Sequence, residues 1–227
     1  MLDLFITRAL AEEAAEETVS TWIGLSQNVW IGIIAVLILA VLLVTSSATR
    51  RIWNAKSLAF AALCIALSTV LRYIKLFEMP QGGSVTLASM FPLMLFAAAY
   101  GVGPGMLVGA AYGFIRYMTG GWFVHPVQFL LDYPLAFALI GLAGLYVHLP
   151  HRWNTWSLYA CMALGALGRA ASATLAGVFF WDTAFWPSLV YNGTYLIPDT
   201  AICMVVAVPL AQRLLKIMRK DTVRKRL

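Results

Sequence analysis

The sequence predicts an all-α integral membrane protein, a bundle of six helices preceded by one extra N-terminal transmembrane helix. Of its 227 residues, 61% are hydrophobic and only 11% are charged, whereas a soluble domain is about 25% charged. The mean hydropathy is +0.81. The apolar residues also fall into separate runs, several of them long enough to cross a bilayer as helices. These observations exclude a water-soluble enzyme. They also exclude a disordered chain, which would have low hydrophobicity and a high content of charged residues.

The hydropathy pattern divides the chain into four parts. Residues 1–25 form an acidic, amphipathic tail without the positively charged start of a secretory signal. The extra transmembrane helix is predicted within residues 26–50, where an uncharged stretch ends at two arginines. The six-helix domain then spans residues 51–216, and a basic tail follows at 217–227. Within this domain the apolar runs predict helices at 57–77, 85–100, 104–119, 126–147, 156–180 and 187–215.

The basic residues predict how these helices are oriented. Seven of the sixteen Lys and Arg residues lie between Arg213 and Arg226, beyond the last apolar run. If the C-terminus is cytoplasmic, eleven basic residues lie inside, four lie outside, and Arg169 lies within the membrane. This asymmetry matches the positive-inside rule. We therefore expect a multi-pass protein of the cell (plasma) membrane with an extracellular N-terminal tail and no nucleic-acid partner.

One carboxylate on the outer side is a candidate for ligand binding. Pro126 suits the first turn of a helix, so Asp132 lies about 9 Å below the helix start at 1.5 Å per residue. A carboxylate at that depth is costly unless it is paired or faces water. His125, Gln128 and Asp132 follow the spacing of one helix face.

The last helix repeats this spacing with Asn192, Tyr195 and Asp199. Asn192 matches the depth of Asp132, and several aromatic residues lie nearby. A carboxylate among aromatic faces favours a flat, cationic ligand. The predicted contacts are Asp132, Tyr133, Asn192, Trp181, His125, Gln128, Trp122, Trp186 and Tyr195. Helix capping is an alternative role for His125, and an interfacial belt is one for Trp122 and Trp186.

Two further patterns lie deeper in the membrane or on a helix face. Arg169 and Asp199 match in depth on consecutive antiparallel helices, which predicts a structural ion pair, with a ligand role as the alternative. Small residues including Ala59, Ala62 and Ala66 recur on one face of the first helix of the bundle. Such a face lets helices approach closely, either within the bundle or against another membrane protein.

The sequence offers no support for catalysis or a cofactor. It contains no phosphate-binding loop of the type G-x-x-x-x-G-K-[ST]. No His, Cys and carboxylate spacing resembles a metal site, and no nucleophile–base arrangement is evident. We therefore expect a protein that is not an enzyme and that holds neither a metal nor a cofactor.

Three strings resemble one known family: MPQGGS at residues 79–84, HPVQ at 125–128 running into LLDYPLAF at 130–137, and VYNGTY at 190–195. They are similar to the thiamine-specific substrate-binding (S) component of energy-coupling factor (ECF) transporters, over about residues 55–215. The resemblance implies a six-helix protein that captures thiamine from outside. It also implies partners in the bilayer and beyond, namely a transmembrane coupling subunit and two ATPase subunits.

The resemblance also implies roles for single residues. Asp132, beside Tyr133, faces the thiamine cation, while Trp181 and Asn192 match other family positions. Ala62 and Ala66, with Ala59 nearby, correspond to the face that contacts the coupling subunit.

Two positions depart from the family pattern. Ala173 replaces a common histidine and Pro187 replaces a common tyrosine, so a close analogue or precursor of thiamine is an alternative ligand. A solitary proton-coupled secondary transporter of a small cationic aromatic solute, with Asp132 or Asp199 as proton carrier, is the alternative function.

Overall fold

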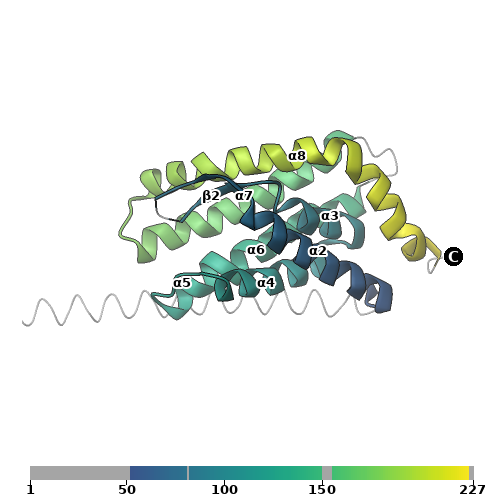
Figure 1. The fold of residues 1–227 in the computed structure, drawn as a ribbon, viewed down its shortest axis with the longest axis horizontal. Coiled ribbons are helices and arrows are strands. Elements are labelled where there is room, and N and C mark those ends of the chain that lie inside the picture. The colour runs from purple at the N-terminus through teal and green to yellow at the C-terminus, as the bar shows by residue number, and fades with distance from the viewer. Residues whose placement is uncertain (1–51, 81, 150–154, 225–227) are drawn as a thin grey trace, which may run out of the picture.

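The computed structural model describes residues 52–80, 82–149 and 155–224. Over this part, the chain forms six helical segments and one short β-hairpin (Figure 1). The predicted six-helix bundle is therefore confirmed in outline. The predicted acidic tail (1–25) and extra transmembrane helix (26–50) lie outside the described residues.

The first described helix, α2, runs from Ala55 to Tyr73. Its N-terminus is closed by a capping box. The Asn54 side chain accepts a hydrogen bond from the Ser57 N–H, and the Ser57 hydroxyl accepts one from the Asn54 N–H, both at 2.9 Å. This satisfies two N–H groups that have no carbonyl partner within the helix. The helix therefore begins and ends slightly earlier than the expected range of 57–77.

A β-hairpin follows where the sequence predicted a helix end, a loop and the start of the next helix. Strands β1 (Lys75–Glu78) and β2 (Ser84–Thr86) pair antiparallel. The turn is closed by the Met79 N–H, which donates to the Gly83 carbonyl at 2.7 Å. Gly82 adopts a φ of 91° there, a conformation that costs glycine little. The fold is therefore mostly helical but not all-α.

The next two helices, α3 (Phe91–Tyr100) and α4 (Val102–Met118), are separated by Gly101 at a φ of 103°. All ten residues of α3 are buried, which explains why this helix is apolar on every side. Because β2 occupies residues 84–86, α3 is shorter than the predicted helix at 85–100.

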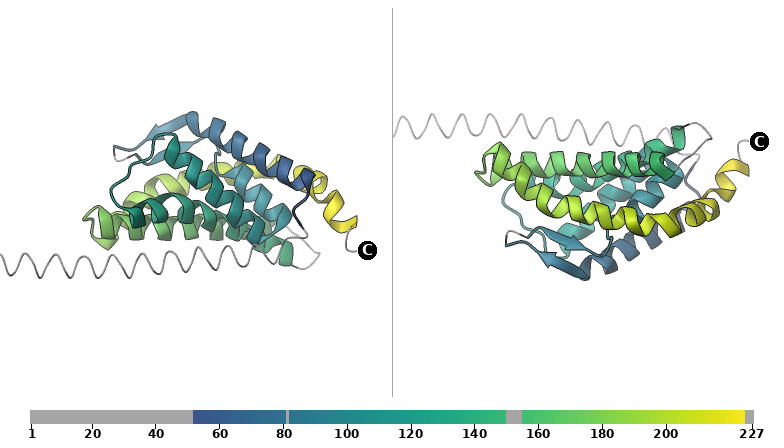
Figure 2. Two further views of the ribbon diagram at one scale, coloured as in Figure 1. Left: turned by 90° about the horizontal axis from the view of Figure 1, so that it is seen from below. Right: turned by 90° about the horizontal axis from the view of Figure 1, so that it is seen from above.

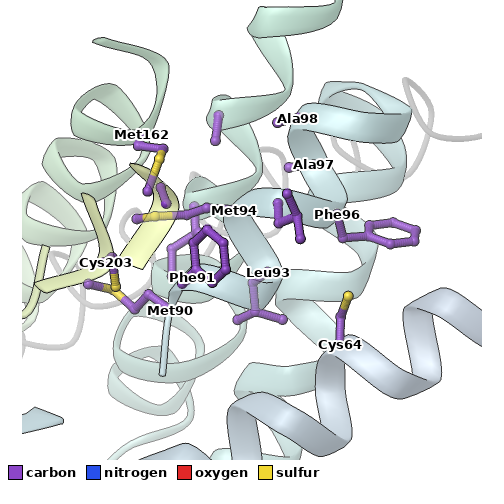
Figure 3. Packing of buried hydrophobic residues seen from close by; sticks show 14 of the residues in the cluster. Cys64, Met90, Phe91, Leu93, Met94, Phe96, Ala97, Ala98, Met162 and Cys203 are labelled. Atoms are coloured by element: carbon purple, nitrogen blue, oxygen red, sulfur yellow. The ribbon is translucent and has the colours of Figure 1, made fainter. Parts of the chain in front are cut away.

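The core is built around α3. Figure 3 shows Met90, Phe91 and Met94 close to Met162 of the later helix α7 and to Cys203 of α8. These side chains are almost completely buried. The packing of apolar side chains from several helices against α3 fixes the bundle from which the functional residues project.

The helix predicted at 126–147 forms as four consecutive helical pieces. They are α5 (Pro126–Leu130), the π-helix η2 (Leu131–Leu135), α6 (Ala136–Leu139) and the 3₁₀-helix η3 (Ile140–His148). Pro134 lies inside η2 and has no N–H to donate, which interrupts the regular hydrogen-bond ladder. Single π turns of this kind occur often at functional sites.

The last two helices are α7 (Thr155–Phe180) and α8 (Phe185–Arg224). Helix α8 contains Pro198 and Pro209 and bends near its C-terminal end (Figure 1). It continues beyond the predicted helix end at 215, so most of the predicted basic tail (217–227) extends this helix.

Four helical segments in the described part are long and apolar enough to cross a membrane: α2, the segment from Pro126 to His148, α7 and α8. The exposed surfaces of α2, α7 and α8 are rich in large apolar side chains, as expected of helices that face lipid. The hairpin, α5 and the turn between α7 and α8 lie at one end of the bundle, and the C-terminus lies at the other (Figures 1 and 2).

Candidate functional site

A cavity extends from the hairpin end toward the middle of the bundle. Its volume is about 900 Å³, at the upper end of the roughly 300–1,000 Å³ found for small-molecule sites. It is lined by the end of α2, the hairpin, α4, η2, α7 and the first half of α8. The lining includes Arg72, Thr86, Tyr112, Arg116, Trp122, Asp132, Tyr133, Phe137, Arg169, Trp181, Tyr191, Asn192, Tyr195 and Asp199.

Asp132 projects into this cavity from the π-helix η2. Its Oδ2 accepts a hydrogen bond of 2.6 Å from Nε2 of Gln128, and the Trp181 side chain faces the same carboxylate as a second neutral donor. Gln128 is fully buried and does not line the cavity. Both contacts are therefore neutral donors that hold the carboxylate in place and leave its charge uncompensated.

Two glycines of α4 allow η2 and α6 to approach that helix closely. A methyl group on Gly113 would collide with the Tyr133 carbonyl, and one on Gly109 would collide with the Phe137 carbonyl. The absence of a side chain at both positions therefore allows the two backbones to pack against each other. On the other side of the segment, the hydroxyl of Ser172 donates to the Leu131 carbonyl at 2.6 Å. These contacts fix the backbone that carries Asp132.

An aromatic wall forms beside the carboxylate. Tyr133 lies with its ring centroid 5.4 Å from that of Tyr117, and its hydroxyl accepts a hydrogen bond of 2.7 Å from the Trp122 N–H. Trp122 and Trp181 also line the cavity. Faces of this kind attract a cation through the ring quadrupole.

Helix α8 supplies a hydrogen-bonded chain on another wall. The Tyr195 hydroxyl donates to Oδ1 of Asn192 at 2.7 Å, and Nδ2 of Asn192 donates to the Ser188 carbonyl at 2.9 Å. Tyr191 accepts a hydrogen bond of 3.1 Å from the Gly83 N–H of the hairpin. Asn192 and Tyr195 therefore lie at the cavity as the sequence predicts.

Arg169 and Asp199, which the sequence predicts as an ion pair, do not form a salt bridge within 4.0 Å among the described residues, although the charge of Arg169 acts on Asp199. Asp199 instead accepts hydrogen bonds from the N–H and hydroxyl of Thr86, at 2.8 and 2.7 Å. The Arg169 guanidinium lies 4.4 Å from the centre of the Phe137 ring. The hairpin supplies the partner that helix periodicity alone could not reveal.

Three predicted ligand contacts do not line the cavity. His125 caps α5, because its Nδ1 accepts a hydrogen bond of 3.2 Å from the Val127 N–H, and it stacks on Phe180. Gln128 supports Asp132 instead of lining the cavity. Trp186 is 71% exposed on the outside of α8. In these cases the spacing identified the correct end of the bundle but not the direction of each side chain.

The cavity is also lined by residues that were not among the predicted contacts, including Arg72, Tyr112, Arg116 and Tyr191. Arg72 and Arg116 lie in the last turns of α2 and α4. Both residues were counted among the basic residues that predict the orientation. The signal that could have placed them in the site is their position at two helix ends on the same side of the membrane as Asp132 in that predicted orientation.

Ala59, Ala62 and Ala66 are exposed on the outer face of α2. They lie away from the cavity, and the opposite face of the helix packs into the core through Ala61 and Cys64. The stripe is therefore not used for packing within the described bundle. Within the described residues, no cluster of three His, Cys, Asp or Glu side chains could hold a metal ion.

The chain is similar to known thiamine transporters. The sequence profile of a family described as "Thiamine transporter protein" matches residues 58–219. Thiamine transporter ThiT of Bacillus subtilis (strain 168) is 35% identical over 158 residues, which cover 61% of this chain and 82% of the relative. ThiT of Lacticaseibacillus paracasei is 28% identical over 136 residues, covering 52% of this chain and 68% of the relative.

The fold is also similar to a solved one. A structure of ThiT from Listeria monocytogenes superposes with a TM-score of 0.61 at 22% sequence identity, covering 71% of this chain and 96% of that chain. At this identity the likeness concerns the arrangement of the helices.

Proposed function

The chain belongs to the thiamine transporter protein family, and we propose that its cavity binds thiamine. Membership of this family makes it a multi-pass membrane transport protein and not an enzyme. Thiamine joins a positively charged thiazolium ring to an aminopyrimidine ring. The observation that carries the proposal is the Asp132 carboxylate, held by Gln128 and Trp181 among aromatic side chains. A carboxylate with only neutral partners attracts a cationic ligand, and the aromatic faces suit its flat rings.

The other cavity residues support a ligand of this type. Asn192 has its Oδ1 and one N–H engaged within α8, so the second N–H remains for a ring nitrogen acceptor. Ala173 also lines the cavity. It replaces the histidine that is common at this position in the family, so the cavity has more space and one polar group fewer at this point. A close analogue or precursor of thiamine fits the same chemistry, and a competition titration distinguishes these ligands.

The chain acts, in this proposal, as the S component of an ECF importer that takes up thiamine from outside the cell. It carries no phosphate-binding loop for ATP, and in this proposal the energy comes from ATPase subunits through a coupling subunit in the membrane. The exposed stripe of Ala59, Ala62 and Ala66 on α2 is the proposed contact face. Small residues there allow a partner helix to approach closely.

Uptake into liposomes tests this assignment. The chain reconstituted with a coupling subunit and two ATPases should accumulate thiamine only when ATP is hydrolysed. Ala62→Leu should abolish uptake while thiamine binding persists, because the larger side chain separates the two proteins. Ala201→Leu, at an exposed alanine of α8, is the matched control and should transport normally. Uptake by the chain alone, driven by a pH gradient, would instead indicate a solitary proton-coupled transporter.

A further inference from the structure

The C-terminal part of α8 extends beyond the length needed to cross a membrane. The candidate span from Phe185 to Met218 contains 34 residues, which corresponds to about 51 Å of helix at 1.5 Å per residue. A bilayer with its headgroup regions is about 40–45 Å thick. Pro209 lies inside the helix, about 36 Å from Phe185, and α8 bends near its C-terminal end (Figure 1). The helix length therefore places the residues after Pro209 at the level of the lipid headgroups.

One face of this segment is packed against the bundle. Ala211, Leu215 and Met218 are buried and belong to the hydrophobic core. In addition, the hydroxyl of Tyr100, at the end of α3, donates a hydrogen bond of 3.3 Å to the Met218 carbonyl. These contacts fix the rotation of the segment about its axis, so its opposite face has a defined composition.

The opposite face combines cations with apolar side chains. Arg213 and Lys216 are exposed, and Leu210 and Ile217 are 43% and 53% exposed. Leu210, Arg213 and Ile217 follow the spacing of one helix face, with Lys216 beside them. Among the described residues, neither cation forms a salt bridge. A basic helix face that also exposes large apolar residues suits the boundary between headgroups and acyl chains.

Other features of this end of the bundle agree with a headgroup region. Trp156, at the start of α7, is 74% exposed, and its ring centroid lies 6.1 Å from that of Tyr159. Tryptophan and tyrosine are enriched at membrane interfaces. The stretch from Arg213 to Arg226 contains seven basic residues and one acidic residue. The carboxylates whose side chains the structure describes lie at the hairpin end or line the cavity: Glu78, Asp132, Asp182 and Asp199.

We propose that this face of α8 binds anionic phospholipids in the leaflet where the helix ends. Arg213 and Lys216 contact the headgroup phosphate, and Leu210 and Ile217 contact the adjoining part of the acyl chains. Phosphatidylglycerol carries a net negative charge, whereas the choline of phosphatidylcholine neutralises its phosphate, so the face prefers phosphatidylglycerol. The proposal goes beyond the proposed function and requires only that α8 crosses the membrane.

Native mass spectrometry of the purified full-length chain in detergent tests this site. Phosphatidylglycerol and phosphatidylcholine with the same acyl chains are titrated separately, and the ratio of their Kd values is the readout. The wild type should favour phosphatidylglycerol about twentyfold or more, because each basic residue near an anionic lipid contributes about fivefold. Arg213→Gln and Lys216→Gln should each reduce the ratio about fivefold, and the double variant about tenfold or more.

Lys75→Gln is the matched control, because it removes an exposed cation from the hairpin end. It should keep the wild-type ratio. The double variant should keep the wild-type melting temperature, because both side chains are exposed outside the cavity. An unchanged ratio in the double variant, or an equal loss in Lys75→Gln, would overturn the proposal.

An acidic surface of a partner protein is the competing occupant of this face. A wild type without a preference for phosphatidylglycerol, together with a double variant that no longer associates with the coupling and ATPase subunits, would assign the face to a protein and overturn the lipid site. Failure of the wild type to bind thiamine would contradict the proposed function, whereas the comparison of the two lipids would still decide this proposal.

Discussion

Nε2 of Gln128 lies 2.6 Å from Oδ2 of Asp132, one helical turn away across the junction of α5 and η2. Gln128 is fully buried, and its Oε1 accepts a hydrogen bond of 3.2 Å from the Val124 N–H. The amide therefore connects the loop before α5 to the carboxylate in the cavity. This link fixes the direction of Asp132 before any ligand arrives, and preorganisation of this kind increases affinity.

The first prediction concerns this link. Gln128→Met keeps the volume of the side chain but removes the donor, so Asp132 loses its direction. Thiamine affinity, measured by tryptophan fluorescence, should fall about tenfold, the size expected for one hydrogen bond to a charged group. His125→Asn preserves a capping acceptor for α5 and should bind normally. Equal affinities for Gln128→Met and the wild type would show that the link is not needed.

The second prediction concerns the close contact between α4 and η2. Gly113→Ala places a methyl group against the Tyr133 carbonyl, so the free energy of unfolding should fall by about 1–3 kcal/mol, as for overpacked cores. Thermal unfolding in detergent measures it. Gly193→Ala is the matched control, because its methyl group would meet only the end of Ile197 at 3.7 Å. It should be at least as stable as the wild type, since alanine is favoured in helices. Equal melting temperatures for both variants would refute the contact.

The third prediction separates two tryptophans at the same end of the bundle. Trp181 contacts Asp132 and lines the cavity, whereas Trp186 is exposed on α8. Trp181→Phe should lose most of the fluorescence change on thiamine addition and bind more weakly. Trp186→Phe should keep its affinity within about twofold, as for a surface substitution. The reverse pattern would place the ligand outside the cavity.

Most of the helices could be predicted because the apolar character of a membrane-crossing helix extends over its whole length. The placement of Gln128 and Asp132 on the same helix face also followed from helix spacing, whereas the hydrogen bond between them was not predicted. Spacing could not give the rotation of a helix about its axis. For that reason spacing could not decide between the two roles considered for each residue: Trp186 is exposed outside the cavity, and His125 takes its alternative role as a helix cap.

The hairpin was missed for a different physical reason. All four residues of β1 are exposed, so its sequence lacks the alternation of apolar and polar residues that marks a half-buried strand. Its position then decided the partner of Asp199, because Thr86 on β2 reaches the carboxylate that depth matching had assigned to Arg169. A contact between residues 113 positions apart depends on the tertiary fold and could not be read from local periodicity.

Titration calorimetry of thiamine into the purified chain and its Asp132→Asn variant tests the central claim most directly. The variant keeps the size of the side chain and one oxygen that can accept from Gln128, and it removes the charge. Wild-type protein should bind thiamine, and Asp132→Asn should bind about thirtyfold or more weakly, the loss expected when one partner of a buried charge pair is neutralised. Equal affinities, or no binding heat from the wild type at micromolar thiamine, would contradict a carboxylate-centred thiamine site.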